Sequence, residues 1–396
     1  MIYLFRSKQK IETQTFAYAF NFFLPTALLI FLSLNGDYNL SAELGLTISI
    51  NYLLTQIFSS NARSILISIK NKDKVVNEVL NFRIFISIIL ILLTCLIQWE
   101  INFTNKLFLL NISFIIILQW IIEIILLKNE IKKNINFFNL YILITLSGTV
   151  LFLFSYYFFN KFSANILLIY NFYLLSIILG GIITNNFGRH KRKIKLNFFI
   201  KNLKTISFLS SFFTQFTNLI WRIMIIFFCG KVIAGIYFSS FAIGSLPSTI
   251  FNISFGPIIL KKKVQFSNLF KHLLKAYVLL SFFLLFLAIL KNTYSDYNLT
   301  DFHFLSVSIC MVASILMIKG TSDRQNYIQN SNVKNFVFKL DVLYNLTLLL
   351  VVPLLFYLGG TSFVMLSFLI ASILSYCFYS LYLNKKIKLN DFKKNS

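Results

Sequence analysis

The chain is poor in the residues on which most enzymatic chemistry depends. Its 396 residues include three histidines, four cysteines and 13 acidic residues. The histidines lie in or near expected loops without metal-ligand spacing, and the cysteines form no CxxC pair. No glycine-rich phosphate loop, nucleophile elbow or pair of carboxylates occurs. These absences argue against a metalloenzyme or a nucleotide-dependent enzyme, and we expect no metal site and no bound cofactor.

Charged residues of any kind are scarce, and long apolar segments take their place. Charged residues make up 13% of the chain and hydrophobic residues 57%, whereas soluble domains are about 25% charged. A membrane span needs about 20 mostly apolar residues. The sequence therefore predicts an all-α polytopic membrane protein with about twelve transmembrane helices. The expected spans are 15–34, 44–69, 82–98, 107–127, 137–159, 164–185, 205–228, 232–260, 272–290, 302–319, 336–357 and 362–383.

The basic residues are numerous but unevenly placed. Of the 37 lysines and arginines, two lie well inside spans, four lie in one set of gaps (Lys106, Lys161, Lys231 and Lys291), and the remaining 31 lie in the alternate gaps or at the span ends that adjoin them. Short loops rich in lysine and arginine stay in the cytoplasm. We therefore expect both termini in the cytoplasm. Because the net charge of +24 is spread over all cytoplasmic segments, it suits anionic lipid and argues against nucleic acid as a partner.

The longest basic gap divides the chain into two sets of six spans. We expect an N-terminal six-helix bundle at 1–187, a basic linker at 188–204, a C-terminal six-helix bundle at 205–384 and a basic tail at 385–396. Because six is an even number, both bundles would enter the membrane in the same orientation, as parallel repeats do.

A weak internal sequence similarity is consistent with a repeat. The second span opens with Gly45 and has Ser49 four residues later, and the eighth opens with Gly235 followed by Ser239 at the same spacing. Glycine and serine are common in membrane helices, so this similarity is a weak indication by itself.

Polar residues form a stripe on two of the spans. On the second span Asn51, Thr55, Ser59 and Arg63 recur at every fourth residue, with Asn61 near the same end, and residues four apart share a helix face. The seventh span repeats the pattern with Gln215, Asn218 and Arg222. Such a stripe either seals against other helices through hydrogen bonds or lines a wet cavity, and the stripe alone favours neither.

Two arginines, Arg63 and Arg222, are expected inside the membrane. Each costs about 2.5–3.5 kcal/mol near the centre of a span. Arg63 could form an ion pair with Glu123, which is the only deep acid expected, and Arg222 could extend to the outer interface beside Trp221. The alternative is that both arginines face a shared cavity and bind an anionic ligand.

Four prolines fall inside expected spans. Pro25 and Pro353 are single breaks, whereas Pro247 and Pro257 weaken the same eighth span. Proline lacks an N–H group and clashes with the preceding helical turn. We interpret each proline alone as a static kink and the pair in the eighth span as a hinge.

Three local stretches extend this pattern of spans. They are FSSNARSI at 58–65, AGIYFS at 234–239 and AIGSLP at 242–247. Together with the two sets of six spans and the basic middle loop, they resemble the Wzx-like O-antigen flippases of the multidrug/oligosaccharidyl-lipid/polysaccharide (MOP) exporter superfamily. The resemblance extends over nearly the whole chain but is diffuse.

The resemblance implies both a fold and a function. The fold would be two six-helix bundles around a central cavity, in the inner membrane of a bacterial cell. The function would be to flip a polyprenyl-diphosphate-linked oligosaccharide from the cytoplasmic to the outer leaflet by alternating access, for surface polysaccharide biosynthesis, with a polysaccharide polymerase as a partner. Cationic cavity residues would bind the diphosphate, a role that suits Arg63 and Arg222. Trp221 stands where relatives often have an acid, so proton or sodium coupling is left open, with Glu123 as the residue for coupling or for an ion pair.

Two other functions stay open at this point. A drug or cation exporter of the same superfamily would be expected to carry more acids in the membrane. An integral-membrane polysaccharide polymerase or glycosyltransferase is the enzymatic alternative, and Asp37 and Glu43 on the first outer loop could suggest it. A polymerase would usually need a long outer loop, which the sequence lacks, and we therefore expect a transporter and not an enzyme.

Overall fold

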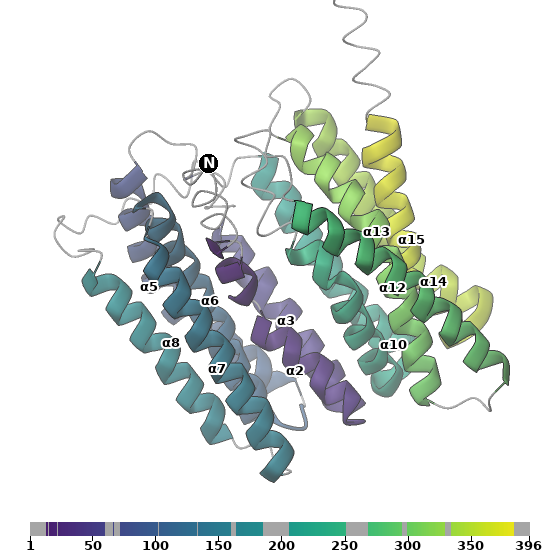
Figure 1. Ribbon diagram of the computed structural model, residues 1–396, viewed down its shortest axis with the longest axis horizontal. Coiled ribbons are helices and arrows are strands. Elements are labelled where there is room, and N and C mark those ends of the chain that lie inside the picture. Colours follow the sequence, from purple (N-terminus) through teal and green to yellow (C-terminus); the bar gives the residue numbers. More distant parts are fainter. Residues whose placement is uncertain are drawn as a thin grey trace, which may run out of the picture. The chain divides into compact units, whose positions relative to one another are not determined.

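The computed structural model describes residues 13–14, 16–21, 23–59, 66, 72–101, 103–132, 134–159, 164–184, 206–250, 268–294, 299–328 and 334–383. Within these ranges the regular structure is helical and contains no strand (Figure 1). Seven helices are long and apolar enough to cross a membrane, and three shorter apolar helices accompany them. The predicted all-α membrane fold is therefore confirmed. The expected linker and the expected tail lie outside the described residues, so the predicted domain boundaries stay predictions.

The chain forms two compact units. The first unit comprises Met1–Phe31 and Leu46–Gln215, and the second comprises Leu32–Gly45 and Phe216–Ser396. The division falls inside α2 (Phe23–Leu34), α3 (Tyr38–Ser59) and α10 (Ile206–Ile250). The hairpin Leu32–Gly45, which joins α2 to α3, is thus part of the second unit although the chain on either side of it is part of the first.

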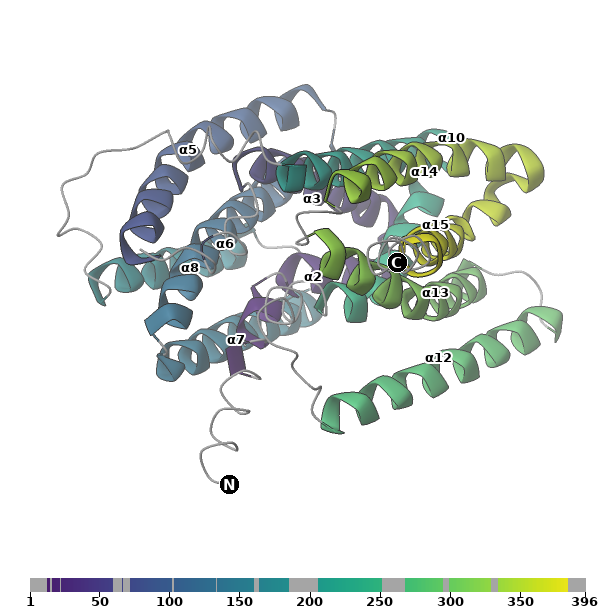
Figure 2. The same ribbon diagram turned by 90° about the horizontal axis from the view of Figure 1, so that it is seen from above.

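The first unit is built around α6. Its helices beyond α2 and α3 are α5 (Lys72–Glu100), α6 (Lys106–Lys132), α7 (Ile135–Phe159) and α8 (Ala164–Thr184). Of the most apolar stretch of α6, 83% is buried, against 39% for α5 and 28% for α7. Figure 2 shows α6 alongside α5 and α8, with which it makes most of its contacts. A helix that is apolar all round belongs in the core, whereas its neighbours leave one face for lipid.

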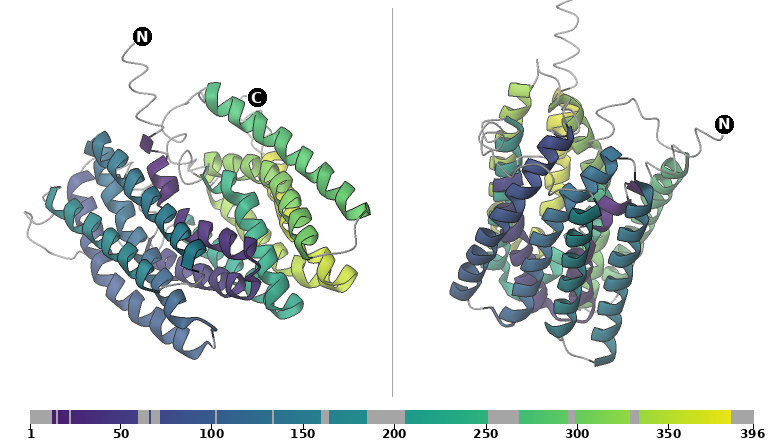
Figure 3. Two further views of the ribbon diagram at one scale, coloured as in Figure 1. Left: turned by 60° about the horizontal axis from the view of Figure 1, so that its bottom comes forward. Right: turned by 90° about the vertical axis from the view of Figure 1, so that its left-hand side faces the viewer.

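In the second unit α13 takes the central place. This unit contains α12 (Asn268–Tyr294), α13 (Leu299–Ile328), α14 (Lys334–Val364), α15 (Ser367–Ser375) and the π-helix η2 (Tyr376–Tyr382). Of the apolar stretch of α13, 67% is buried, against 11% for α12. Figure 3 shows α12 running along the outside of this group of helices, where it packs on α13.

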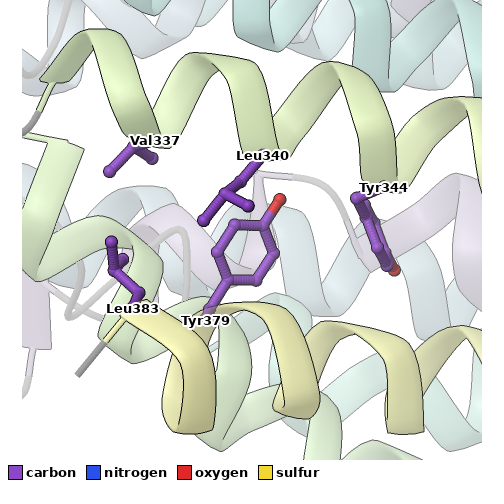
Figure 4. Packing of buried hydrophobic residues seen from close by; sticks show 5 residues of the cluster. All are labelled: Val337, Leu340, Tyr344, Tyr379 and Leu383. Carbon is purple, nitrogen blue, oxygen red and sulfur yellow. The ribbon is translucent and has the colours of Figure 1, made fainter. Parts of the chain in front are cut away.

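A hydrophobic cluster of the second unit lies where η2 packs on α14. Val337, Leu340 and Tyr344 from α14 pack against Tyr379 and Leu383 (Figure 4). The tyrosine rings of this cluster meet edge to face at 5.8 Å between centroids, which is a favourable geometry for an aromatic pair.

Glycine and proline break the helices at different places. Gly230 has φ 78° and ψ 166°, a conformation that favours glycine, and it separates the seventh expected span from the eighth within α10. Gly360, with φ 65°, breaks α14 in the same way. Pro247 lies inside α10 at helical dihedral angles, and Pro257 lies outside the described residues. The hinge expected at these two prolines therefore stays a prediction.

Candidate functional site

The first unit contains a buried arginine, Arg83 on α5, that is held by α3 and α6. Its side chain is 1% exposed. It donates hydrogen bonds to the Glu123 carboxylate at 2.8 Å, to the Ser59 hydroxyl at 3.1 Å and to the carbonyl oxygen of Trp120. The guanidinium also lies 4.6 Å from the centre of the Trp120 ring. An arginine and a carboxylate at this distance neutralise each other's charge, so Glu123 has an ion-pair partner on α5.

This pair is a correction, because Arg83 was expected at the cytoplasmic end of the span 82–98 and only two arginines were expected inside the membrane. Helix α5 begins at Lys72, well before the apolar run, so Arg83 lies three turns inside the helix and not at its start. The partner considered for Glu123 was Arg63. Both Arg63 and Asn61 lie outside the described residues, and their assignment to substrate binding stays a prediction.

The polar stripe on α3 makes hydrogen bonds to neighbouring helices of the first unit. Asn51 donates from Nδ2 to the Ser113 hydroxyl of α6 at 2.9 Å, and Gln98 of α5 donates to the same hydroxyl at 2.7 Å. The Thr55 hydroxyl donates to the Asn51 carbonyl at 2.8 Å, within α3. At Asn51, as at Ser59, the stripe therefore joins helices, which is the first of the two alternatives that the pattern left open. A substrate-binding role for these residues stays a prediction.

The second unit holds Arg222 by different chemistry. This residue of α10 is 9% exposed, and it donates a hydrogen bond to the carbonyl oxygen of Gly45 on α3. Its guanidinium lies 5.0 Å from the centre of the Phe238 ring. A Cβ on Gly45 would lie 2.4 Å from that ring and 3.1 Å from Nη1 of the arginine. The absence of a side chain at Gly45 thus makes the space in which the guanidinium and the ring sit.

Around Arg222, the hairpin Leu32–Gly45 packs on α10 at very short range. A Cβ on Gly235 would lie 2.0 Å from the carbonyl oxygen of Tyr38, so the two backbones meet where neither side has room for a side chain. The Ser41 hydroxyl donates to the Gly235 carbonyl at 3.3 Å, and Lys231 Nζ lies 2.9 Å from a carboxylate oxygen of Glu43. We call this set of contacts, together with those of Ser33 described next, the hairpin seam.

A buried serine continues the hairpin seam toward α13. The Ser239 hydroxyl lies 2.8 Å from the Ser33 hydroxyl and 2.9 Å from Nε2 of His303. The His303 ring also meets the Tyr38 ring edge to face at 6.2 Å. The stretches at Gly45 and Gly235, which are similar in sequence, pack against each other within the second unit.

One acidic residue of the hairpin seam was misplaced by the sequence-based expectation. Glu43 was expected on an outer loop, but α3 begins at Tyr38 and the Glu43 side chain is 2% exposed. His303, expected in or near a loop, lies in the second turn of α13 and is 7% exposed. Hydropathy alone does not report the partners that bury such polar residues in the first turns of a helix.

Another ion pair overturns the expectation that Glu123 is the only deep acid. Asp341 of α14 is 1% exposed and accepts two hydrogen bonds from Arg324 of α13, at 2.7 and 2.9 Å. The Tyr379 hydroxyl donates to the same carboxylate at 2.6 Å. Helix α13 extends to Ile328 and so carries Arg324 beside α14, whereas the expected span ended at 319. The described residues contain no cluster of three or more His, Cys, Asp or Glu side chains that could hold a metal ion.

Two further expected site residues, Gln215 and Asn218, lie on α10 and are half-buried. Neither makes a hydrogen bond to another residue of the described ranges. Asn218 and Arg222 are one helical turn apart in the second unit, so the structure places this part of the predicted seventh-span stripe on one face of α10.

Comparisons with known proteins show the fold. No protein-family model matches the sequence, and no curated protein is detectably similar to it. Among solved structures, lipid II flippase MurJ in an inward closed conformation is 18% identical, with a TM-score of 0.58 over 94% of this chain and 87% of that one.

Two transporter structures match over similar lengths. A multidrug resistance MATE family transporter in an outward-facing conformation is 14% identical, with a TM-score of 0.59 over 98% of this chain and 97% of the other. A MOP superfamily transporter from Pyrococcus furiosus is 13% identical, with a TM-score of 0.54 over 96% of both chains. The chain has the fold of the MOP superfamily transporters.

Proposed function

We propose that the protein is a flippase that moves a polyprenyl-diphosphate-linked oligosaccharide from the cytoplasmic to the outer leaflet for surface polysaccharide biosynthesis. The fold is shared along nearly the whole chain with a lipid II flippase, but also with a multidrug transporter. The choice between a lipid-linked anion and a drug cation as substrate therefore has to rest on the charges inside the helices.

The ion pairs made by the acidic residues favour an anionic substrate over a cationic one. Within the described helices Glu43, Glu123, Asp301, Asp323 and Asp341 each form an ion pair with a lysine or an arginine. Carboxylates engaged in this way are neutralised by the protein itself, which leaves little negative charge to attract a cationic drug. The same helices contain a buried arginine, Arg222, which donates a hydrogen bond to the carbonyl oxygen of Gly45 and lies over the Phe238 ring. A diphosphate crossing the hydrocarbon region needs positive charge of this kind.

Arg222 is suited to a phosphate group by geometry as well as by charge. The planar guanidinium presents two parallel N–H donors to phosphate oxygens, which an ammonium group does not. Its hydrogen bond to the carbonyl oxygen of Gly45 orients the guanidinium, and this bond can be exchanged for a stronger, charge-assisted bond to phosphate. Arg63, predicted to act with Arg222, keeps that predicted role.

Alternating access requires a closure that opens and closes again. The hairpin seam suits this task because its polar contacts are individually weak. A neutral hydrogen bond contributes about 0.5–1.5 kcal/mol, and an ion pair with one partner in solvent contributes about 0–1 kcal/mol. The distribution of the basic loops predicts that this hairpin lies on the outer side of the membrane.

Deleting the gene and following the lipid-linked oligosaccharide tests this function. We expect surface polysaccharide to be lost and the lipid-linked repeat unit to accumulate in the cytoplasmic leaflet, where an impermeant glycosidase added outside does not reach it. Accumulation in the outer leaflet would instead identify the polymerase that consumes the product. Unchanged surface polysaccharide with increased sensitivity to ethidium would identify a cation exporter.

A further inference from the structure

The face of α10 beside Arg222 carries two more polar groups in the middle of an apolar helix. Asn218 and Trp221 lie four residues and one residue before Arg222, and both are half-buried. Within the described part of the chain, neither the Asn218 amide nor the Trp221 indole N–H makes a hydrogen bond. Unpaired polar groups are costly in hydrocarbon, and a tryptophan N–H normally finds a partner. This face is therefore built to meet a polar ligand or water.

Aromatic residues of the second unit hold the Trp221 indole in place. Its ring centre lies 5.5 Å from that of Phe241 and 6.3 Å from that of Phe238. Phe241 in turn packs edge to face on the buried Phe368 at 4.7 Å. Phe238 is fully buried and is the same ring over which Arg222 lies. The indole and the guanidinium thus share one rigid neighbour and lie side by side at the same level of α10.

We propose that Trp221 and Asn218 form the subsite for the first sugar of the diphosphate-linked lipid. This inference rests on the proposed function and names the part of the substrate that α10 recognises. In such a lipid the sugar is bonded directly to the distal phosphate, so a residue that holds the phosphate also fixes where the sugar lies. The apolar C–H face of a sugar packs on an indole ring, and the indole N–H and the amide can hydrogen-bond its hydroxyl groups.

Binding of two lipids to the purified full-length protein tests the subsite. The probes are a short-chain polyprenyl diphosphate and the same lipid carrying one hexose. We expect the native protein to bind the hexose-bearing lipid at least tenfold more tightly. Trp221→Leu is expected to reduce this preference about tenfold while leaving affinity for the sugar-free lipid unchanged. Trp221→Phe keeps an aromatic face but no N–H group, and is expected to reduce the preference by a smaller factor.

The control is Trp99→Leu, which removes a tryptophan that is 77% exposed at the end of α5, and which is expected to leave both affinities unchanged. Arg222→Ala should weaken binding of both lipids and leave the ratio between them intact. A folded Trp221→Leu protein with the native preference would overturn the sugar subsite and leave the flippase proposal standing. A native protein that binds neither lipid would contradict the proposed function itself, and the subsite with it.

Discussion

Two buried arginines, one in each unit, are held by opposite chemistry. In the first unit, Arg83 is bound by the carboxylate of Glu123 together with a hydroxyl and a carbonyl group. In the second unit, Arg222 donates to the carbonyl of Gly45 and lies over an aromatic ring. Both residues would cost several kcal/mol in a bilayer without partners. The difference indicates that Arg83 serves to join helices, whereas under the proposed function Arg222 binds the diphosphate of the substrate.

The largest expected effect comes from breaking the neutralised pair of the first unit. Arg83→Ala leaves Glu123 without its ion-pair partner among buried groups, and we expect it to destabilise the protein by about 3–5 kcal/mol. The measurement is thermal unfolding of the detergent-purified protein together with its level in the membrane. Arg83→Ala with Glu123→Gln should recover most of the loss, because the carboxylate charge is gone as well. A double variant as unstable as the single one would contradict the assignment of Glu123 as the partner.

The next effect concerns the hairpin seam of the second unit. Ser33 and Ser239 have hydroxyl oxygens 2.8 Å apart, which suits a disulfide between cysteines at these positions. In a variant whose four native cysteines are replaced, Ser33→Cys with Ser239→Cys should form this disulfide and lose transport of the lipid-linked oligosaccharide, with recovery on reduction. Ser239→Cys alone is the control. Full transport in the oxidised double variant would show that the seam does not open.

A smaller effect is expected at the glycine that makes room for Arg222. In Gly45→Ala the added methyl group meets Phe238 and Arg222, and overpacking of this kind costs about 1–3 kcal/mol. We expect a several-fold loss of transport at a nearly native protein level. Gly180→Ala is the matched control, since a Cβ there meets no atom within 4 Å; alanine should leave transport unchanged and stabilise α8 by up to about 1 kcal/mol. Equal transport in the two variants would argue against the need for space at Gly45.

The smallest effect is expected from the proline of the eighth span. Pro247→Ala restores a backbone N–H inside α10 and should stiffen the helix. If the proline is a moving hinge, the variant should insert normally and transport a few-fold more slowly. Transport at the native rate with equal protein level would leave Pro247 as a static kink.

The helices could be predicted from the sequence, but the partners of the charged residues could not. Hydropathy located the spans because burial in lipid depends on local composition. It placed Arg222 inside the membrane for the same reason, since that residue lies far from any loop. It missed the burial of Arg83, Glu43 and Asp341, which lie at or near the ends of the expected spans 82–98, 44–69 and 336–357. Near the end of a span, the local hydropathy does not distinguish a loop residue from a buried residue.

The glycines of the hairpin seam show the same limit. Gly45 and Gly235 were recognised as similar positions in the second and eighth spans. Their role, however, depends on contacts with residues far away in the sequence, Phe238 and Tyr38. A close helix approach needs small residues on both sides, and the sequence gives the small residues without their partners. The pairing of the acids, on which the proposal of an anionic substrate rests, could not be predicted either.

A direct comparison of the two arginines in one assay tests the central claim. Native protein, Arg222→Ala and the double variant Arg83→Ala with Glu123→Gln are reconstituted at equal amounts in liposomes that contain a fluorescent polyprenyl-diphosphate-linked hexose, and the rate of leaflet exchange is measured. We expect Arg222→Ala to fall to the rate of protein-free liposomes, Arg222→Lys to recover it only partly, and the double variant to stay within a few-fold of the native rate. Native exchange with Arg222→Ala, or loss confined to the folded double variant, would contradict the account.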